Sequence, residues 1–189
     1  WNLTKLAESL LPLLHENADE AMKQAEVAIS EYANDFNSAW ISGMRSKLGL
    51  LNEEEGDYDL AQSLLEWMES SKADYTETFR DLAYENLSEK EIYKSLAFKK
   101  WHDLWQARLS RNSKPIKSAL SMMRKCNPVI IPYNYLVEEA LVAAEEGNMN
   151  PFLKLLSALE KPFEFSSSNK VFLNSPVNRN PHYQTFCGT

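Results

Sequence analysis

The sequence predicts an all-α protein, an irregular bundle of several helices with an extended C-terminal tail. Leu, Ala, Glu, Lys and Ser dominate the first two thirds of the chain, and only five of its 189 residues are Gly. No segment alternates apolar and polar residues as a half-buried strand would. Hydrophobic residues make up 44% of the chain, enough for a sizeable core. We expect a helical domain over residues 1–162 and an irregular tail over residues 163–189.

Apolar residues at helical spacing define the first two expected helices. The first carries a stripe of leucines that Pro12 should kink or interrupt, namely Leu3, Leu6, Leu10, Leu13 and Leu14. The second runs from about Asp19 to Leu48, where basic residues followed by Gly49 form a helix stop. One side of this helix carries Ala21, Ala25, Ala28, Ile29, Tyr32, Phe36, Trp40 and Met44.

An acidic turn over residues 53–57 separates this helix from the next. Its composition could suit calcium, but the ligand spacing of an EF-hand is missing. We therefore expect a solvated connection, with Asp57 capping a helix that carries Leu60, Leu64, Leu65, Trp67 and Met68.

Two capping signatures predict the following helices. Asp74 with Glu77 opens one, and Ser88 with Glu91 precedes another that carries Ile92, Leu96, Trp101, Leu104, Trp105 and Leu109. Four tryptophans fall at helical spacing among Leu and Met, which favours core positions over a cofactor box: Trp40, Trp67, Trp101 and Trp105.

Asn112-Ser113-Lys114-Pro115 ends that helix and begins a short one that runs through Met122 and Met123. The basic cluster of this region favours a solvated helix face over a phosphate site; it consists of Lys114, Lys117, Arg124 and Lys125.

Prolines and glycines organise the last third of the chain. The two prolines of residues 127–132 exclude a continuous helix and predict a buried apolar linker. A helix should follow and stop at Gly147, and a last one should begin with Asn150 as its cap and Pro151 in first position. We expect that helix to end near Leu159.

Charge and composition exclude several classes of function. A net charge of −7 and a pI of about 5.1 argue against a general nucleic-acid binder. No apolar run is long enough to cross a bilayer, no signal peptide opens the chain, and two cysteines make no secreted disulfide framework. A cytoplasmic protein with no membrane partner is expected. Because Trp1 replaces the usual Met, we expect a fragment of a larger chain.

The residues alone nominate no catalytic, cofactor-binding or metal-binding side chain. The sequence has no glycine-rich phosphate loop, no zinc-type spacing of Cys and His, and no nucleophile elbow. Cys187, third from the end of the tail, suits a free cysteine on a frayed terminus. This pattern indicates an acidic helical domain, for which a stand-alone protein-interaction module is one possible function.

Several blocks in order resemble one family, the selenoprotein O family of protein adenylyltransferases. They are Trp1-Asn2-Leu3 with Leu6-Ala7 and Leu10, then Met44–Leu50, Asp74–Thr76 with Thr78–Leu82, Asn127-Pro128 with Asn134, Leu136, Glu138–Ala140 and Ala143–Gly147, and finally Tyr183–Thr189. The last block resembles the family's C-terminus, where Cys or selenocysteine stands third from the end. Tyr133 is a departure, because the family commonly has Arg before that Asn.

The resemblance implies the C-terminal helical part of a protein-kinase-like fold. Such an enzyme uses ATP and Mg or Mn to transfer AMP to Ser, Thr or Tyr hydroxyls of protein substrates. The family's catalytic and metal-binding residues would lie upstream of Trp1, so no cofactor is expected here and the partner is the missing N-terminal kinase-like lobe. Cys187 then becomes a candidate redox residue with a partner in that lobe, and Cys126 a buried structural thiol.

Overall fold

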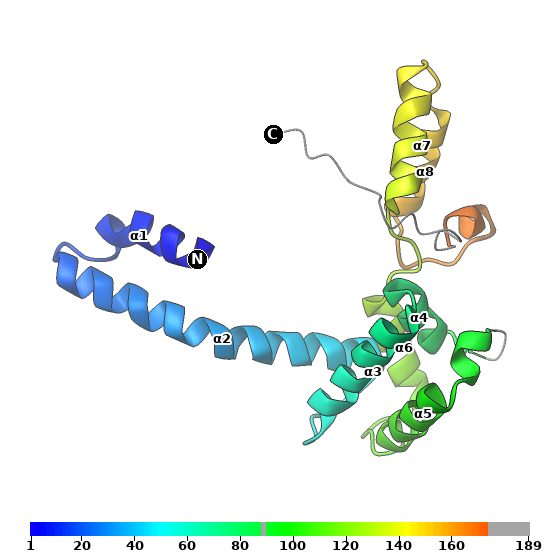
Figure 1. Ribbon diagram of the computed structural model, residues 1–189, viewed down its shortest axis with the longest axis horizontal. Helices are drawn as coiled ribbons and strands as arrows, with labels where there is room; N and C mark the ends of the chain where they lie inside the picture. The colour runs from blue at the N-terminus through cyan, green and yellow to red at the C-terminus, as the bar shows by residue number, and fades with distance from the viewer. Residues whose placement is uncertain (88–89, 174–189) are drawn as a thin grey trace. The chain divides into compact units, whose positions relative to one another are not determined.

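The computed structural model describes residues 1–87 and 90–173 and confirms the all-α class, with no strand in these two ranges. The chain divides into two compact units, residues 1–44 and a second unit that begins at residue 45, and Figure 1 shows their helices. The α-helices of the described residues are α1 (Asn2–Leu14), α2 (Ala18–Leu48), α3 (Asp57–Ser71), α4 (Tyr75–Ala83), α5 (Leu96–Leu109), α6 (Ile116–Cys126), α7 (Asn134–Glu145) and α8 (Asn150–Leu159). None of these helices is long and apolar enough to cross a bilayer.

The first unit is a helical hairpin in which α1 lies along the first part of α2 (Figure 1). Asn17 caps α2, since its side-chain oxygen accepts hydrogen bonds from the amides of Asp19 and Glu20 at 2.9 and 3.1 Å. The expected break at Pro12 is not seen, because α1 continues to Leu14 and Pro12 falls in its last turn. No residue of α1 is buried, whereas Ala21 and Ala25 of α2 are.

The second unit is built around the C-terminal end of α2. The helix stops as predicted at Gly49, which has a φ of +74°, and side chains from three other segments bind the carbonyls exposed there. Trp105 donates to the carbonyl oxygen of Leu48 at 2.9 Å, Asn112 to that of Gly49 at 2.9 Å, and Asn127 to that of Lys47 at 2.8 Å. These contacts anchor the end of α2 against α5, α6 and the loops that follow them.

Aromatic side chains fill the core between α3 and α5, which confirms the core assignment of three of the four tryptophans. Trp67 packs against Phe98 with a ring-centroid distance of 4.6 Å, and Trp101 stacks on Trp105 at 5.8 Å. Trp40 lies in the other unit and is only half-buried. Trp101 also donates to the carbonyl oxygen of Leu60, so both indole N–H groups in this stack have partners.

Helix α5 begins later than the sequence predicts. Residues Glu91–Lys94 form a short 3₁₀ turn, and Ser95 caps α5 by accepting a hydrogen bond from the amide of Phe98. Ser88, the predicted cap, lies outside the described residues. The Asp74 cap is confirmed, because its carboxylate accepts from the amide of Glu77 at 2.8 Å.

Residues 127–132 form the predicted buried linker. Val129 and Ile130 are each 1% exposed, and the amides of both donate to the carbonyl oxygen of Pro162. Helices α7 and α8 follow and pack against each other as a hairpin (Figure 1). Gly147 ends the first with a φ of +88°, as predicted. The second begins one residue earlier than expected, with Met149 in the cap position and Asn150 already helical.

Candidate functional site

Of the two cysteines in the sequence, the structure describes Cys126. Cys187, the predicted redox residue, lies outside the described residues. Cys126 ends α6 as a free thiol that is only half-buried, so the expectation of a buried structural thiol is wrong in its degree of burial. Burial lowers the pKa of Lys47, whose backbone carbonyl lies at the same junction as the end of α6.

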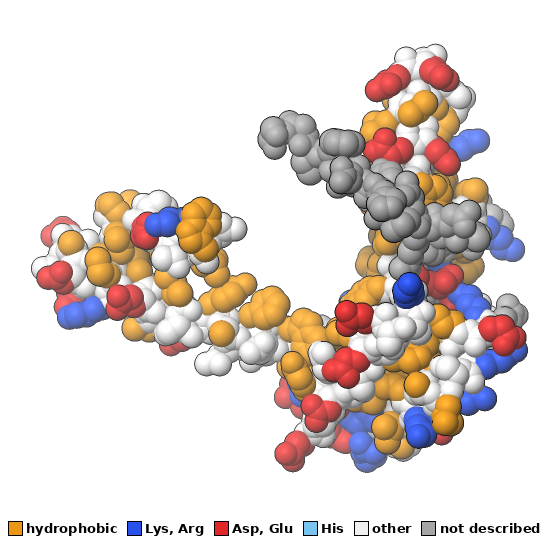
Figure 2. Space-filling model, in the orientation of Figure 1, with side chains coloured by type: hydrophobic (Ala, Val, Ile, Leu, Met, Phe, Trp, Pro, Cys, Tyr) orange, Lys and Arg blue, Asp and Glu red, His pale blue; other side chains and the backbone are white. Residues whose placement is uncertain are grey.

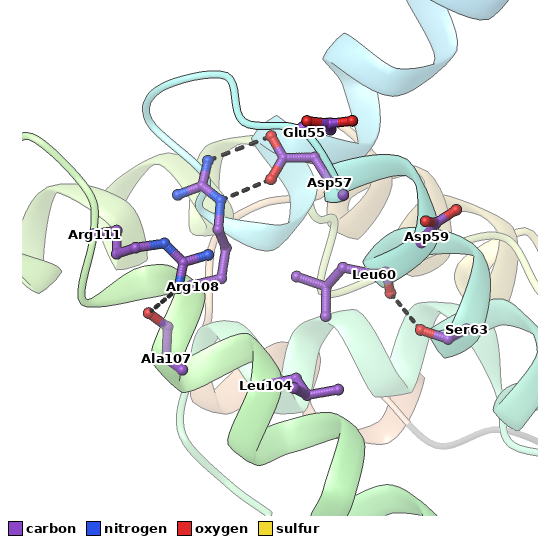
Figure 3. A pocket seen from close by; sticks show the side chains of 10 residues that line it. Glu55, Asp57, Asp59, Leu60, Ser63, Leu104, Ala107, Arg108 and Arg111 are labelled. Carbon is purple, nitrogen blue, oxygen red and sulfur yellow. Dashed lines mark hydrogen bonds and ion pairs between the residues drawn. The ribbon is translucent and has the colours of Figure 1, made fainter.

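A pocket of about 400 Å³ between α3 and α5 is lined by several charged side chains (Figure 3). Leu60 and Leu104 line it from the two helices, and Arg108 and Arg111 come from the last turn and end of α5. Asp57, the first residue of α3, points at the guanidinium of Arg108 (Figure 3).

Asp57 and Arg108 form a nearly inaccessible ion pair at the base of this pocket. Nε of Arg108 donates to Oδ1 of Asp57 at 2.7 Å, and Nη2 donates to Oδ2 at 3.3 Å. Oδ2 also accepts from Nε of Arg45 at 2.8 Å and from the amide of Glu54 at 3.0 Å. The side chains of Asp57 and Arg108 are only 1% and 4% exposed. Both carboxylate oxygens are thus held by donors from α2, the acidic turn and α5.

The electrostatics of Asp57 follow from this arrangement. Burial opposes ionisation, but the hydrogen bonds from Arg108, the Glu54 amide and Arg45 outweigh it and hold the pKa of Asp57 below its ordinary value. Its neighbour Glu54 pairs with Arg108 at 3.2 Å and with Arg111 at 2.8 Å, and the hydrogen bond from Arg111 lowers the pKa of that carboxyl. The carboxylates here are therefore ionised acceptors rather than proton donors at neutral pH.

The acidic turn is exposed at Glu53, Glu55 and Gly56, as a solvated connection would be, but the geometry corrects the prediction for Asp57. Asp57 does not cap α3, since Gly56 occupies the cap position and the Asp57 side chain is buried. We call the whole set the Asp57 cluster; it comprises Arg45, Glu53, Glu54, Asp57, Arg108 and Arg111. Its three cations and three anions balance, so the cluster joins the end of α2 to α3 and α5 without net charge.

A second buried carboxylate lies at Asp81 in α4. Tyr93 donates to its Oδ2 at 2.8 Å, and Lys90 pairs with the same oxygen. Burial raises the pKa of Asp81, although Lys90, Tyr93 and Arg80 act against that rise. Tyr133 contacts the same helix, because its hydroxyl donates to the Asp74 carboxylate at 3.3 Å. The residue that departs from the family pattern thus has a partner within this chain.

The arginines and Ser63 of the pocket are engaged by other groups of the chain. The arginines that line the pocket are paired with carboxylates of the same chain, and Ser63 donates to the carbonyl oxygen of Leu60. Across residues 1–87 and 90–173, no group of three or more His, Cys, Asp or Glu side chains could hold a metal ion. These residues do not fit ATP or its metal, and the ion pairs of the Asp57 cluster connect the end of α2 with α3 and α5.

Comparison with known proteins gives the chain its family. The family model for the protein adenylyltransferase SelO matches residues 1–160. The chain belongs to the SelO family of protein adenylyltransferases. Within the SelO family it is 44% identical over 190 residues to a protein nucleotidyltransferase YdiU of Clostridium botulinum strain Eklund 17B, and 45% identical to that of Bacillus mycoides strain KBAB4. A YdiU of Nitrosococcus oceani is 44% identical.

These SelO relatives are much longer than the chain. The match covers 100% of this chain but only 39% of the Clostridium and Bacillus proteins and 38% of the Nitrosococcus protein. The chain thus spans about two fifths of the length of these relatives.

Proposed function

We propose that this chain is the C-terminal helical region of a protein adenylyltransferase that transfers AMP from ATP to Ser, Thr or Tyr hydroxyls of proteins. Membership of the SelO family is the observation that carries the proposal, because the family model covers residues 1–160. The name protein nucleotidyltransferase, given to relatives 44% and 45% identical, agrees with that reaction class.

In this proposal the groups that bind ATP and a divalent metal lie outside these 189 residues, and the helices support them. The internal pairing of the Asp57 cluster supports this division, since its charges already neutralise one another. Incubation with α-labelled ATP and Mg²⁺ or Mn²⁺ tests it. The longer family protein should transfer labelled AMP to protein, and the 189-residue chain should not. Transfer by the 189-residue chain alone would contradict the proposal.

The partner of these helices is, in this proposal, the rest of the same polypeptide. The apolar stripe of α2 supports this, because Tyr32 and Phe36 lie at helical spacing and are 48% and 53% exposed. Figure 2 shows the hydrophobic side chains exposed along this stretch of α2. A catalytic lobe that covered them would bury an apolar surface that the described residues leave open.

Introducing a charge on the stripe tests this partner. Phe36→Asp should lower the Tm of the longer protein by several degrees and leave that of the 189-residue chain unchanged. Asn37→Asp, which adds the same charge at the neighbouring exposed position, is the control and should change neither. Equal effects of Phe36→Asp on both proteins would rule out a lobe seated on this stripe.

We also propose that Cys187 is a redox-sensitive thiol of the longer protein, a role supported by the resemblance of the tail. Mass mapping without reductant, combined with AMP transfer under oxidising and reducing conditions, tests it. Cys187→Ser should abolish the redox response, and the control Cys126→Ser should keep it. An unchanged response in Cys187→Ser would remove this role.

A stand-alone interaction module is the second candidate. It is supported by a groove of about 230 Å³ between α1 and α2, lined by apolar side chains that include Leu3, Leu6, Leu10, Ile29 and Tyr32. Such a groove resembles those that accept an amphipathic helix. A defined complex of the 189-residue chain with a partner protein, formed without the rest of the polypeptide, would favour this candidate.

A further inference from the structure

One side of α6 forms a groove that no other function claims. The groove has a volume of about 480 Å³ and is lined by Leu51, Lys114, Lys117, Ser118, Ser121, Met122 and Lys125. We call these residues the lysine groove. Leu51 and Met122 are half-buried, whereas the three lysines are exposed.

The lysines of this groove have no counterion in residues 1–87 and 90–173. Among the described residues, no carboxylate oxygen of Asp or Glu lies within 4.0 Å of Nζ of Lys114, Lys117 or Lys125. Arg124, in contrast, donates to the carbonyl oxygen of Ala83 and lies over the Tyr84 ring. In a chain of net charge −7, this groove therefore concentrates unneutralised positive charge.

The first turn of α6 adds to that charge. Its cap position is Pro115, which makes no side-chain hydrogen bond to the helix, and Lys114 and Lys117 lie at this positive end of the helix. The sequence predicts only a solvated helix face here. The structure adds the hollow and shows that nearby carboxylates, Glu53 and Glu54, are paired elsewhere.

The spacing of the lysines sets the size of the ligand. Lys117 and Lys125 are eight residues apart on α6, which at 1.5 Å per residue separates them by about 12 Å along the axis. Cations spaced along a helix in this way suit a ligand that carries several negative charges along its length. An extended peptide, which advances about 3.3 Å per residue, spans this distance with roughly four residues.

The lining also distinguishes between anionic polymers. Nucleic-acid grooves for single strands provide aromatic rings on which bases stack, and none of the lining residues is aromatic. Arginine forks, which hold phosphates in a bidentate manner, are absent from this lining too, and its cations are lysine ammonium groups that act as point charges. The hydroxyls of Ser118 and Ser121 lie between the lysines and can donate to backbone carbonyls or carboxylates.

We propose that the lysine groove is the docking site for an Asp- or Glu-rich segment of a partner protein. The carboxylates of this segment would pair with Lys117 and Lys125, and its apolar carbons would cover Leu51 and Met122. Residues 174–189 of the chain contain no Asp or Glu, so this tail does not have the composition of the ligand. The proposal is independent of the adenylyltransferase activity.

Fluorescence anisotropy of the 189-residue chain with a labelled Glu-rich peptide tests the proposal. We expect saturable binding that weakens severalfold between about 50 and 300 mM NaCl, because the contacts are exposed ion pairs. Lys117→Glu with Lys125→Glu should weaken binding at least tenfold, and the corresponding double alanine variant should give an intermediate loss. The matched control is Lys99→Glu with Lys100→Glu on α5, which makes the same charge change at exposed positions outside the groove. This control should change the affinity less than twofold.

Four outcomes would overturn the proposal. They are the absence of saturable binding, equal binding of a Gln-substituted peptide, equal losses in the groove variant and the control, and tighter binding of a single-stranded oligonucleotide of equal charge. Circular dichroism of each variant confirms that the helices remain folded, and the peptide and oligonucleotide comparisons on the unmodified chain do not depend on any variant.

Discussion

At the scale of single residues, Asp57 connects three segments of the second unit. It accepts hydrogen bonds from Arg45, Arg108 and the Glu54 amide while it is almost fully buried. An ion pair in such a position returns little net stability when intact, but the loss of one partner leaves an uncompensated buried charge. The cluster should therefore be sensitive to truncation of either partner.

Arg108→Met should destabilise the second unit by about 3–5 kcal/mol, because it leaves the Asp57 carboxylate buried with fewer cationic donors. Urea unfolding followed by circular dichroism measures the free energy of unfolding. The control is Arg111→Met, which removes an exposed arginine from the same cluster and should cost less than about 1 kcal/mol. Equal costs for the two variants would show that Asp57 does not depend on Arg108.

The lowered pKa of Asp57 predicts a specific acid sensitivity. Folding holds the pKa of this carboxyl below its ordinary value of 3.8, so the carboxylate stabilises the fold above that pH and loses its contribution as the pH falls through the folded pKa. Asp81 has the opposite effect on the pH dependence of stability, because burial raises the pKa of its carboxyl. A difference between wild type and Asp57→Asn isolates the first effect.

The free energy of unfolding of wild type and of Asp57→Asn should be measured from about pH 6 to about pH 3. The difference between the two proteins changes by up to about 1.4 kcal/mol for each unit by which folding shifts the pKa. Wild type should lose more stability across this range than Asp57→Asn, and the two curves should approach each other below pH 3.8. Parallel curves for the two proteins would contradict the assigned role.

The sequence could not predict this cluster for a physical reason. Asp57 lies 12 residues from Arg45 and 51 from Arg108, so their pairing depends on how α2 and α5 pack. A capping role was the natural interpretation of an acid that precedes a helix. A useful signal was present only in Arg108, a charged residue on the same helix side as the apolar Trp101 and Trp105.

At the scale of elements, the turn that ends α2 places two separate requirements on Gly49. Gly49 adopts a φ of +74°, and a Cβ built on it would lie 2.9 Å from Sδ of Met123. This position therefore needs glycine both for its backbone conformation and for the close approach of α6. The sequence identified the first requirement through the helix stop, but not the second.

Gly49→Ala should cost about 2–4 kcal/mol, from left-handed strain of about 1–2 kcal/mol plus displacement of Met123. Gly147→Ala is a matched control: its φ is +88°, but no atom lies within 4 Å of the added Cβ. The control should show the strain alone. The difference between the two unfolding free energies measures the close packing, and a difference near zero would show that Met123 moves aside freely.

Helix boundaries were predictable where one residue type fixed them locally. Asp74 and the helix stops at Gly49 and Gly147 fall where expected, because capping and left-handed geometry involve only near neighbours. The predicted start of α5 was wrong. Ser88 has an acidic residue three positions later, as a capping box requires, whereas Ser95, the observed cap, has none. The capping-box pattern therefore favoured the earlier serine over the one that the packing of Phe98 selects.

At the scale of the whole molecule, the two units differ in how much they bury. The tryptophan-rich core and the Asp57 cluster belong to residues 45–173, whereas α1 has no buried residue. Local stability follows buried apolar contact and protected hydrogen bonds, so it should differ between the units.

Hydrogen exchange of the 189-residue chain should show this difference directly. We expect amides of α1 to exchange at least about 100-fold faster than those of α5, a difference of about 3 kcal/mol in opening free energy. Amides of α2 near Leu48 should exchange slowly, because that end is bound by Trp105, Asn112 and Asn127. Uniform protection across α1 and α5 would contradict this expectation.

The fold class was predictable from the sequence because helical periodicity and scarce glycine act at every position. The exposure of Tyr32 and Phe36 could not be predicted in the same way. An apolar stripe in the sequence shows that a surface is hydrophobic, but not whether another part of the chain covers it.

The guanidinium of Arg80 sets an order in which the molecule can be completed. From α4 it donates to the carbonyl oxygen of Val129 at 3.4 Å and to that of Leu173 at 2.7 Å, across 49 and 93 residues of sequence. A ribosome synthesises α4 long before it reaches either acceptor. Contacts between residues so far apart in sequence make folding slower. A nascent chain therefore cannot complete both of these hydrogen bonds until residue 173 has emerged, so the guanidinium of Arg80 waits for its last acceptor longer than for any contact within α4.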